Sequence, residues 1–146
     1  EMWTTTTAGE FIFPLKSAPK MVQSKIMKAV KDGPRLTVKF FQQDASGSEP
    51  VRDWLKTLPL DEKKAVGEDI KAVQFGWPLG LPLVDRLDGD IWEVRTKLEN
   101  RIARVLFVVD GAEIILLHGF IKKGMKTPKQ DLDLAKDRLK RMRGKK

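Results

Sequence analysis

Three apolar stretches near the end of the chain, separated by two very short links, constrain the fold most. They cover residues 91–97, 102–109 and 112–120, and each has the residue pattern of a strand. The second link, residues 110–111, is an Asp-Gly pair, which is a strong signal for a two-residue hairpin. Strands joined by such tight turns pair antiparallel. The sequence therefore predicts an antiparallel meander of three strands.

The segments around the meander predict one more strand and three helices. Residues 36–41 alternate as a strand does, and residues 51–58 and 61–76 place apolar side chains at helical spacing. Thr127 is suited to cap a last helix, whose apolar face falls within residues 132–142. This order predicts an α+β domain. In it, a small antiparallel sheet, made of the N-terminal strand and the meander, packs with two N-terminal helices and one C-terminal helix.

The length and composition of the chain indicate one domain with an extension. The chain has 146 residues, and one domain is expected per ~150 residues. Residues 1–33 differ from the rest, since they contain a low-complexity run of threonines and several prolines. We therefore expect an N-terminal extension over residues 1–33 and the folded domain over residues 34–146.

Cysteine is absent and His118 is the only histidine. This composition excludes disulfides, cysteine-ligated metals and a metal site built from several histidines, so we expect no metal and no cofactor. Every apolar stretch, such as residues 114–117, is far shorter than the ~20 residues of a membrane span. We expect a cytoplasmic protein with no membrane partner.

Positive charge is concentrated in the last third of the chain. The formal net charge is +8, and all of the excess lies in residues 95–146, whereas residues 1–94 are almost balanced. Clustered basic groups gain binding free energy by releasing the counterions that surround phosphates. The distribution therefore favours a polyanionic partner such as a nucleic acid, and the alternative is a solvated basic surface.

The alternation of the first two meander strands places basic side chains on shared faces. Glu93 and Arg95 point away from the side of Trp92, and Arg104 lies on one face of the second strand. The basic side chains of these strands, their ends and the loop that follows are Arg95, Lys97, Arg101, Arg104, Lys122, Lys123 and Lys126. An arginine stays charged and can hold two phosphate oxygens at once. The pattern therefore predicts a surface for the phosphodiester backbone of a single strand.

Each of these residues also has a structural interpretation. Arg95 could form a surface ion pair with Glu93, two residues before it. Arg104 would be costly to bury unpaired, which leaves either a function or a buried partner. Residues 122–123 could be ordinary surface lysines. His118 could be a packed, hydrogen-bonded side chain or a catalytic group.

Several sequence blocks at fixed spacing resemble a known family. The blocks are Leu87-Asp88-Gly89-Asp90-Ile91-Trp92-Glu93-Val94-Arg95, Arg101-Ile102-Ala103-Arg104-Val105-Leu106-Phe107, Leu116-Leu117-His118-Gly119-Phe120-Ile121-Lys122-Lys123 and Thr127-Pro128. Over residues 35–143 the chain resembles the HigB-like, phage-derived branch of the RelE/ParE toxin superfamily. The resemblance implies a RelE-like fold and the toxin of a type II toxin–antitoxin pair.

The resemblance also implies an activity and a set of partners. The expected activity is ribosome-dependent cleavage of mRNA without a metal, by attack of the 2′-hydroxyl on the adjacent phosphate. The expected partners are a cognate antitoxin, in the form of a small helix-turn-helix protein, and mRNA on the ribosome. Operator DNA would be contacted only through the toxin–antitoxin complex.

Site residues follow from the matched positions. Arg95 and Arg104 match the phosphate-holding arginines of the family, and the lysines at 122–123 match the basic pair after the last strand. The chain has no tyrosine, so the general base is His118 or a lysine with a lowered pKa, or else the protein relies on electrostatics and on positioning by the ribosome. Together with the basic cluster, this predicts a catalytic set of Arg95, Arg104, His118, Lys122 and Lys123, and RNA binding by Arg101, Lys126 and Lys97.

Two other functions stay open at this point. A ParE-like toxin has the same fold but inhibits DNA gyrase and has no nuclease activity. A non-catalytic nucleic-acid-binding module would use the same basic face, with aromatic side chains such as Phe120 or Trp77 stacking on bases.

Overall fold

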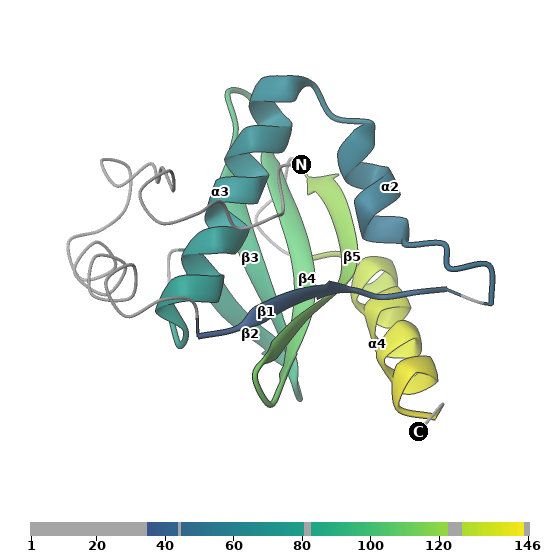
Figure 1. Ribbon diagram of the computed structural model, residues 1–146. Coiled ribbons are helices and arrows are strands. Elements are labelled where there is room, and N and C mark those ends of the chain that lie inside the picture. Colours follow the sequence, from purple (N-terminus) through teal and green to yellow (C-terminus); the bar gives the residue numbers. More distant parts are fainter. Residues whose placement is uncertain (1–34, 44, 81–82, 123–126, 145–146) are drawn as a thin grey trace.

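The computed structural model describes residues 35–43, 45–80, 83–122 and 127–144. These residues form five strands and three helices (Figure 1). In chain order the elements are β1 (Thr37–Phe40), α2 (Pro50–Lys56), α3 (Leu60–Gly76), β2 (Val84–Asp88), β3 (Ile91–Lys97), β4 (Ile102–Asp110), β5 (Glu113–Lys122) and α4 (Lys129–Gly144). The extension predicted for residues 1–33 lies outside the described residues.

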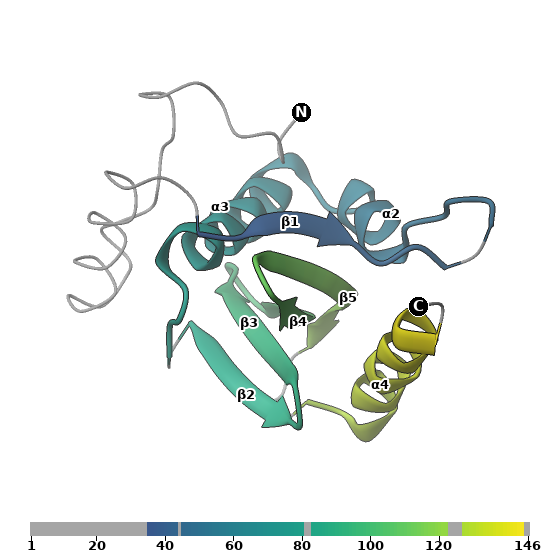
Figure 2. The ribbon, with the colours of Figure 1, turned by 60° about the horizontal axis from the view of Figure 1, so that its bottom comes forward.

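The strands form one sheet with helices on both faces (Figure 2). Helices α2 and α3 cover one face, where Ile70 of α3 and Phe107 of β4 belong to the larger hydrophobic cluster. Helix α4 lies on the other face, where its Leu139 packs in a second cluster with Leu106 of β4. This layered arrangement confirms the predicted α+β class, with two helices before the meander and one after it.

The sheet is mixed and not wholly antiparallel. Its strand order is β1-β5-β4-β3-β2, and the predicted meander of β3, β4 and β5 is confirmed. The prediction is wrong for β1, which pairs with β5 in parallel and places Val38 opposite Ile114. Helices α2 and α3 follow β1 in the chain, so no tight turn fixes its direction against a neighbouring strand.

The sequence analysis missed β2, the edge strand that pairs antiparallel with β3. Three of its five residues are charged, and Asp in particular is depleted in strands. Charged side chains on an edge strand are a common protection against pairing with another chain. Strand β2 matters for the site because it places Asp85 directly opposite Glu93 of β3.

An irregularity in β5 decides which of its side chains face α4. Leu106 of β4 pairs with His118, but the next residue, Phe107, pairs with Leu116, so Leu117 is an extra residue. Such a bulge puts two neighbouring side chains on one side of the sheet. Leu117 and His118 both face α4, where Leu117 packs in the second cluster and the His118 ring bonds to a side chain of α4.

Beyond the bulge, a close contact fixes the orientation of β5. Gly119 faces α2, and a Cβ atom built on it would lie 2.3 Å from the ring of Trp54. Real Cβ atoms essentially never approach so closely, so this position needs glycine. The same orientation leaves Phe120 and Lys122 on the α4 side of the sheet.

Candidate functional site

The pairing of β3, β4 and β5 arranges the α4 side of the sheet in rows. Starting at the last residues of β3 and β5, the rows are Lys97–Ile102–Lys122, Arg95–Arg104–Phe120, Glu93–Leu106–His118 and Val108–Ile115. The last row belongs to the hydrophobic cluster under α4. This face therefore changes from basic at one end to apolar at the other, and its polar rows are the candidate functional site.

Arg95 lies in the second row and is bound by two carboxylates. Its Nε donates to Glu93 Oε2 at 2.7 Å, and its Nη2 donates to Asp85 Oδ2 at 3.0 Å. The Arg95 side chain keeps 28% of its surface exposed. The predicted pair with Glu93 is therefore present, but Asp85 of the edge strand is a second partner.

Arg104 lies beside Arg95 but is buried, with 1% of its side chain exposed. Its Nη1 donates to Glu93 Oε1 at 3.3 Å and to Thr127 Oγ1 at 3.1 Å. The Thr127 hydroxyl in turn donates to Glu93 Oε1. Thr127 was expected as a helix cap, but its hydroxyl is bound to this buried pair. Of the two interpretations of Arg104, the structure shows the buried partner, and Glu93 is that partner.

Glu93 is the centre of this network, since its two oxygens serve both arginines and Thr127. Its side chain is completely buried, and a buried carboxylate is tolerated only when it is paired and hydrogen-bonded. The charges of Glu93 and Asp85 balance those of Arg95 and Arg104. Positive charge in excess at this site therefore comes from the neighbouring row of lysines.

Lys97 and Lys122 are the two lysines of that first row. Lys97 is exposed and Lys122 is half-buried, and both stand on the same face as Arg95. Within the described residues no ion pair engages either of them. They are therefore available to an anion that approaches Arg95 from this end of the sheet.

His118 is held between β5 and α4. Its Nε2 lies 2.7 Å from Asp131 Oδ1 in the first turn of α4, and its ring stacks on Phe120 with 5.3 Å between the centroids. Only 14% of its side chain is exposed. Burial lowers the pKa of His118 and outweighs the nearby charge of Asp131, while the charge of Arg138 adds to the lowering. These contacts fit the interpretation of a packed, hydrogen-bonded histidine.

One of the remaining predicted residues, Arg101, is not brought to this face. Arg101, in the link between β3 and β4, binds Glu62 of α3, with Nε 3.2 Å from Oε2. Because α3 covers the opposite face, this contact directs Arg101 away from Arg95. Lys123 and Lys126 lie in the segment 123–126, outside the described residues.

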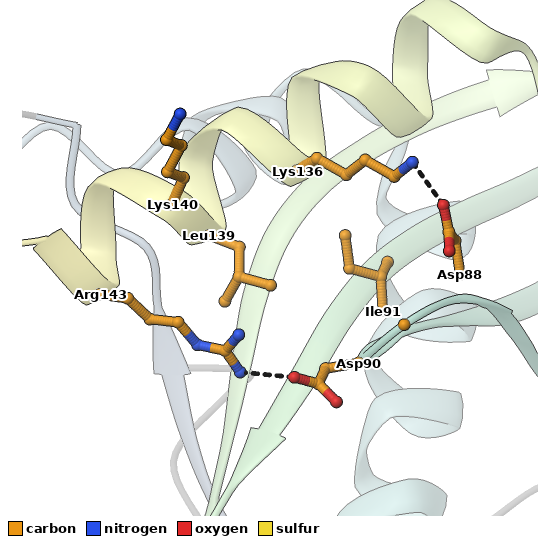
Figure 3. Close-up of a pocket in the computed structure, with 8 residues that line it drawn as sticks. Asp88, Asp90, Ile91, Lys136, Leu139, Lys140 and Arg143 are labelled. Atoms are coloured by element: carbon orange, nitrogen blue, oxygen red, sulfur yellow. Dashed lines mark hydrogen bonds and ion pairs between the residues drawn. The ribbon is translucent and has the colours of Figure 1, made fainter.

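A separate cavity of about 500 Å³ lies between α4 and the link from β2 to β3 (Figure 3). Ile91 and Leu139 form its apolar part. Two ion pairs cross it, one from Lys136 to Asp88 and one from Arg143 Nη2 to Asp90 Oδ2 at 2.8 Å. These exposed pairs connect the later turns of α4 to the end of β2 and to the link that follows it.

Among the residues that the structure describes, no helix is long and apolar enough to cross a membrane. In the same residues, no group of three or more His, Asp or Glu side chains is placed to hold a metal ion.

In the polar rows, the sequence analysis missed three partners of the predicted residues, namely Asp85, Thr127 and Asp131. Asp85 reaches the site through the pairing of β2 with β3, and the sequence of β2 has no regular alternation that would predict a strand. The roles of Thr127 and Asp131 depend on where α4 lies against the sheet, and no local pattern reports that placement.

Comparison with known proteins places the chain in a family. Residues 53–140, more than half of the chain, match the family model described as phage derived protein Gp49-like (DUF891). The chain belongs to this family. The Gp49-like family is known as a RelE/HigB-like toxin type, so this protein is a toxin-type module. The matched region contains the whole meander and most of α4. No curated protein matches the chain.

Proposed function

We propose that this Gp49-like protein is the toxin of a type II toxin–antitoxin system and a metal-independent endonuclease that cleaves mRNA on the ribosome. The observation that carries the proposal is the position of Arg95. Its guanidinium is fixed by the buried Glu93 and stays partly exposed. It stands beside Lys97 and Lys122, which no ion pair among the described residues engages. This arrangement suits the binding of a phosphate of an RNA strand that crosses the basic end of the sheet.

The proposed chemistry is attack of the RNA 2′-hydroxyl on the adjacent phosphate, which forms a 2′,3′-cyclic phosphate and releases the 5′-oxygen of the next nucleotide. Negative charge builds on the phosphate in the transition state, and a fixed guanidinium stabilises it. Arg95 is the group in this role. Lys97 and Lys122 hold neighbouring phosphates. As part of the proposal, Lys123 keeps its expected role in catalysis and Lys126 its expected role in RNA binding. Arg101 is left out of the site, because Glu62 of α3 binds it on the other side of the sheet. Arg104 acts through Glu93 as a positioning residue, because its own side chain is buried.

The proposal includes an antitoxin, because toxin-type modules of this class are paired with one. A small helix-turn-helix protein is the expected partner, and operator DNA would be bound through the complex of the two proteins. The neighbouring reading frame tests this part directly, since a short gene for such a protein is expected there.

One observation favours a second candidate function. The chain has no tyrosine, and His118 is packed between β5 and α4 with 14% of its side chain exposed, so neither a tyrosine nor an open histidine is offered as the general base. A ParE-like toxin that inhibits DNA gyrase needs no such base, and neither does a non-catalytic nucleic-acid-binding module. These alternatives predict different results in the same experiment.

We expect induced expression of the protein to stop bacterial growth and to lower mRNA levels within minutes. Cleavage on purified ribosomes should give fragments that end in a 2′,3′-cyclic phosphate, measured by end mapping. Growth arrest with intact mRNA and broken DNA would show the gyrase inhibitor instead. Binding of RNA without either effect would show the non-catalytic module.

We expect His118→Ala to lower the melting temperature by about 4 °C, since losing one hydrogen bond to a charged group costs roughly 1–2 kcal/mol. The cleavage rate per folded molecule should change little, because the ring is packed between β5 and α4 with only 14% of its side chain exposed. A general base would contribute ~10²–10⁴ to the rate, and its loss would flatten the pH–rate profile near neutrality. A flat profile with an unchanged melting temperature would show that His118 is the base.

A further inference from the structure

The two carboxylates on Arg95 differ in a way that suggests different roles. Glu93 is completely buried, whereas 34% of the Asp85 side chain is exposed on the edge strand β2. We propose that Asp85 is a competing anion, which holds Arg95 Nη2 until an RNA phosphate displaces it and thereby sets how tightly the site binds a phosphodiester. This inference rests on the proposed function and deepens it.

The geometry gives Glu93 and Asp85 separate atoms of Arg95. Glu93 engages Nε at 2.7 Å, and Asp85 engages Nη2 at 3.0 Å. A phosphate that binds the end of a guanidinium at two points uses both Nη atoms. Such a phosphate therefore needs Nη2, the atom that donates to Asp85, but it leaves the bond to Glu93 intact.

The energetics also favour displacement of Asp85. Exposed ion pairs are weak because water screens them, whereas removing one member of a buried pair leaves an uncompensated charge. A phosphate can therefore replace Asp85 at low cost while Glu93 keeps the guanidinium in place. Asp85 neutralises Arg95 and so weakens the binding of free RNA. An mRNA that the ribosome holds near the site is therefore bound in preference to free RNA.

We expect Asp85→Asn to bind a short 2′-O-methyl RNA about 3- to 5-fold more tightly than the wild type, as expected for the loss of a competing exposed pair. Asn keeps the size of the side chain and an acceptor oxygen but removes the charge. The methylated RNA has no free 2′-hydroxyl and cannot be cleaved by the proposed reaction. The measurement is the Kd of the full chain across a range of salt concentrations.

Asp90→Asn is the matched control. It releases Arg143 Nη2 from an aspartate at 2.8 Å and adds the same charge to the protein, but at the cavity beside α4 (Figure 3). We expect this variant to change the Kd much less than Asp85→Asn does. Equal tightening by both variants would reflect net charge alone and would overturn the inference.

The remaining outcomes separate this inference from the proposed function. If the wild type binds the RNA and Asp85→Asn binds it no more tightly, Asp85 does not compete and only this inference fails. If neither protein binds the RNA, the inference fails, and cleavage on purified ribosomes decides the proposed function separately. Tighter binding by Asp85→Asn that Arg95→Ala abolishes supports both.

Discussion

Arg95→Ala should lower the rate of mRNA cleavage by ~10²–10³, the usual effect of removing one fixed charge contact to a transition state. The side chain is partly exposed, so we expect the variant to stay folded. Cleavage is measured on purified ribosomes with a defined mRNA, and folding is checked by thermal melting. In cells, the same variant should no longer arrest growth.

Arg143→Ala serves as the control for this experiment. Arg143 is also an arginine on the α4 side that donates through Nη2 to a single aspartate, but it lies at the cavity beside α4 and not in the polar rows. We expect near-normal cleavage from it. Full toxicity of a soluble Arg95→Ala protein would show that the polar rows are not the site.

Glu93→Ala should lower the free energy of unfolding by about 3–5 kcal/mol, the usual effect of removing one member of a buried ion pair. Arg104 is 1% exposed and would lose the carboxylate that balances its charge. Thr127 would lose its acceptor at the same time, so the start of α4 should loosen as well. Urea unfolding of the variant and the wild type gives the difference.

A double variant separates the buried charge from the packing. Glu93→Leu combined with Arg104→Met replaces the pair by apolar side chains, and such replacements are often neutral or stabilising. We expect the double variant to recover most of the lost stability but not the cleavage activity, because Arg95 would no longer be held through Nε. A single Glu93→Ala variant as stable as the wild type would contradict this account of the network.

The meander and its two faces could be predicted because the information is local. Tight turns set the direction of β3, β4 and β5. Alternation along β3 predicted that Glu93 and Arg95 lie on the other face of the sheet from Trp92, and the strand pairing and the cluster that contains Trp92 confirm this. The same reasoning limited Arg104 to a function or a buried partner. Because an unpaired charge is costly to bury, a buried Arg104 was expected to have a partner, although the sequence did not show that this partner is Glu93.

The rest of the site depends on contacts between residues far apart in the chain. Asp85 reaches Arg95 across ten residues and Thr127 reaches Glu93 across 34, through strand pairing and helix placement that no short pattern encodes. Arg101 matched a basic cluster in the sequence, but Glu62 on α3 binds it on the other side of the sheet. Charge alone did not show which basic residues share a surface.

The extra residue in β5 has a consequence for which changes of length the strand tolerates. Deleting Leu117 would remove the bulge and leave His118 opposite Leu106 and Leu116 opposite Phe107. All the remaining side chains of β5 would then stay on the same face of the sheet as before. Deleting Phe120 would instead reverse the sides of the residues that follow it. Lys122 would then take the place of the half-buried Ile121, which packs against the larger hydrophobic cluster. β5 thus has one residue, Leu117, that has no partner in its pairing with β4. This residue lies between the apolar first half of the strand and its basic end.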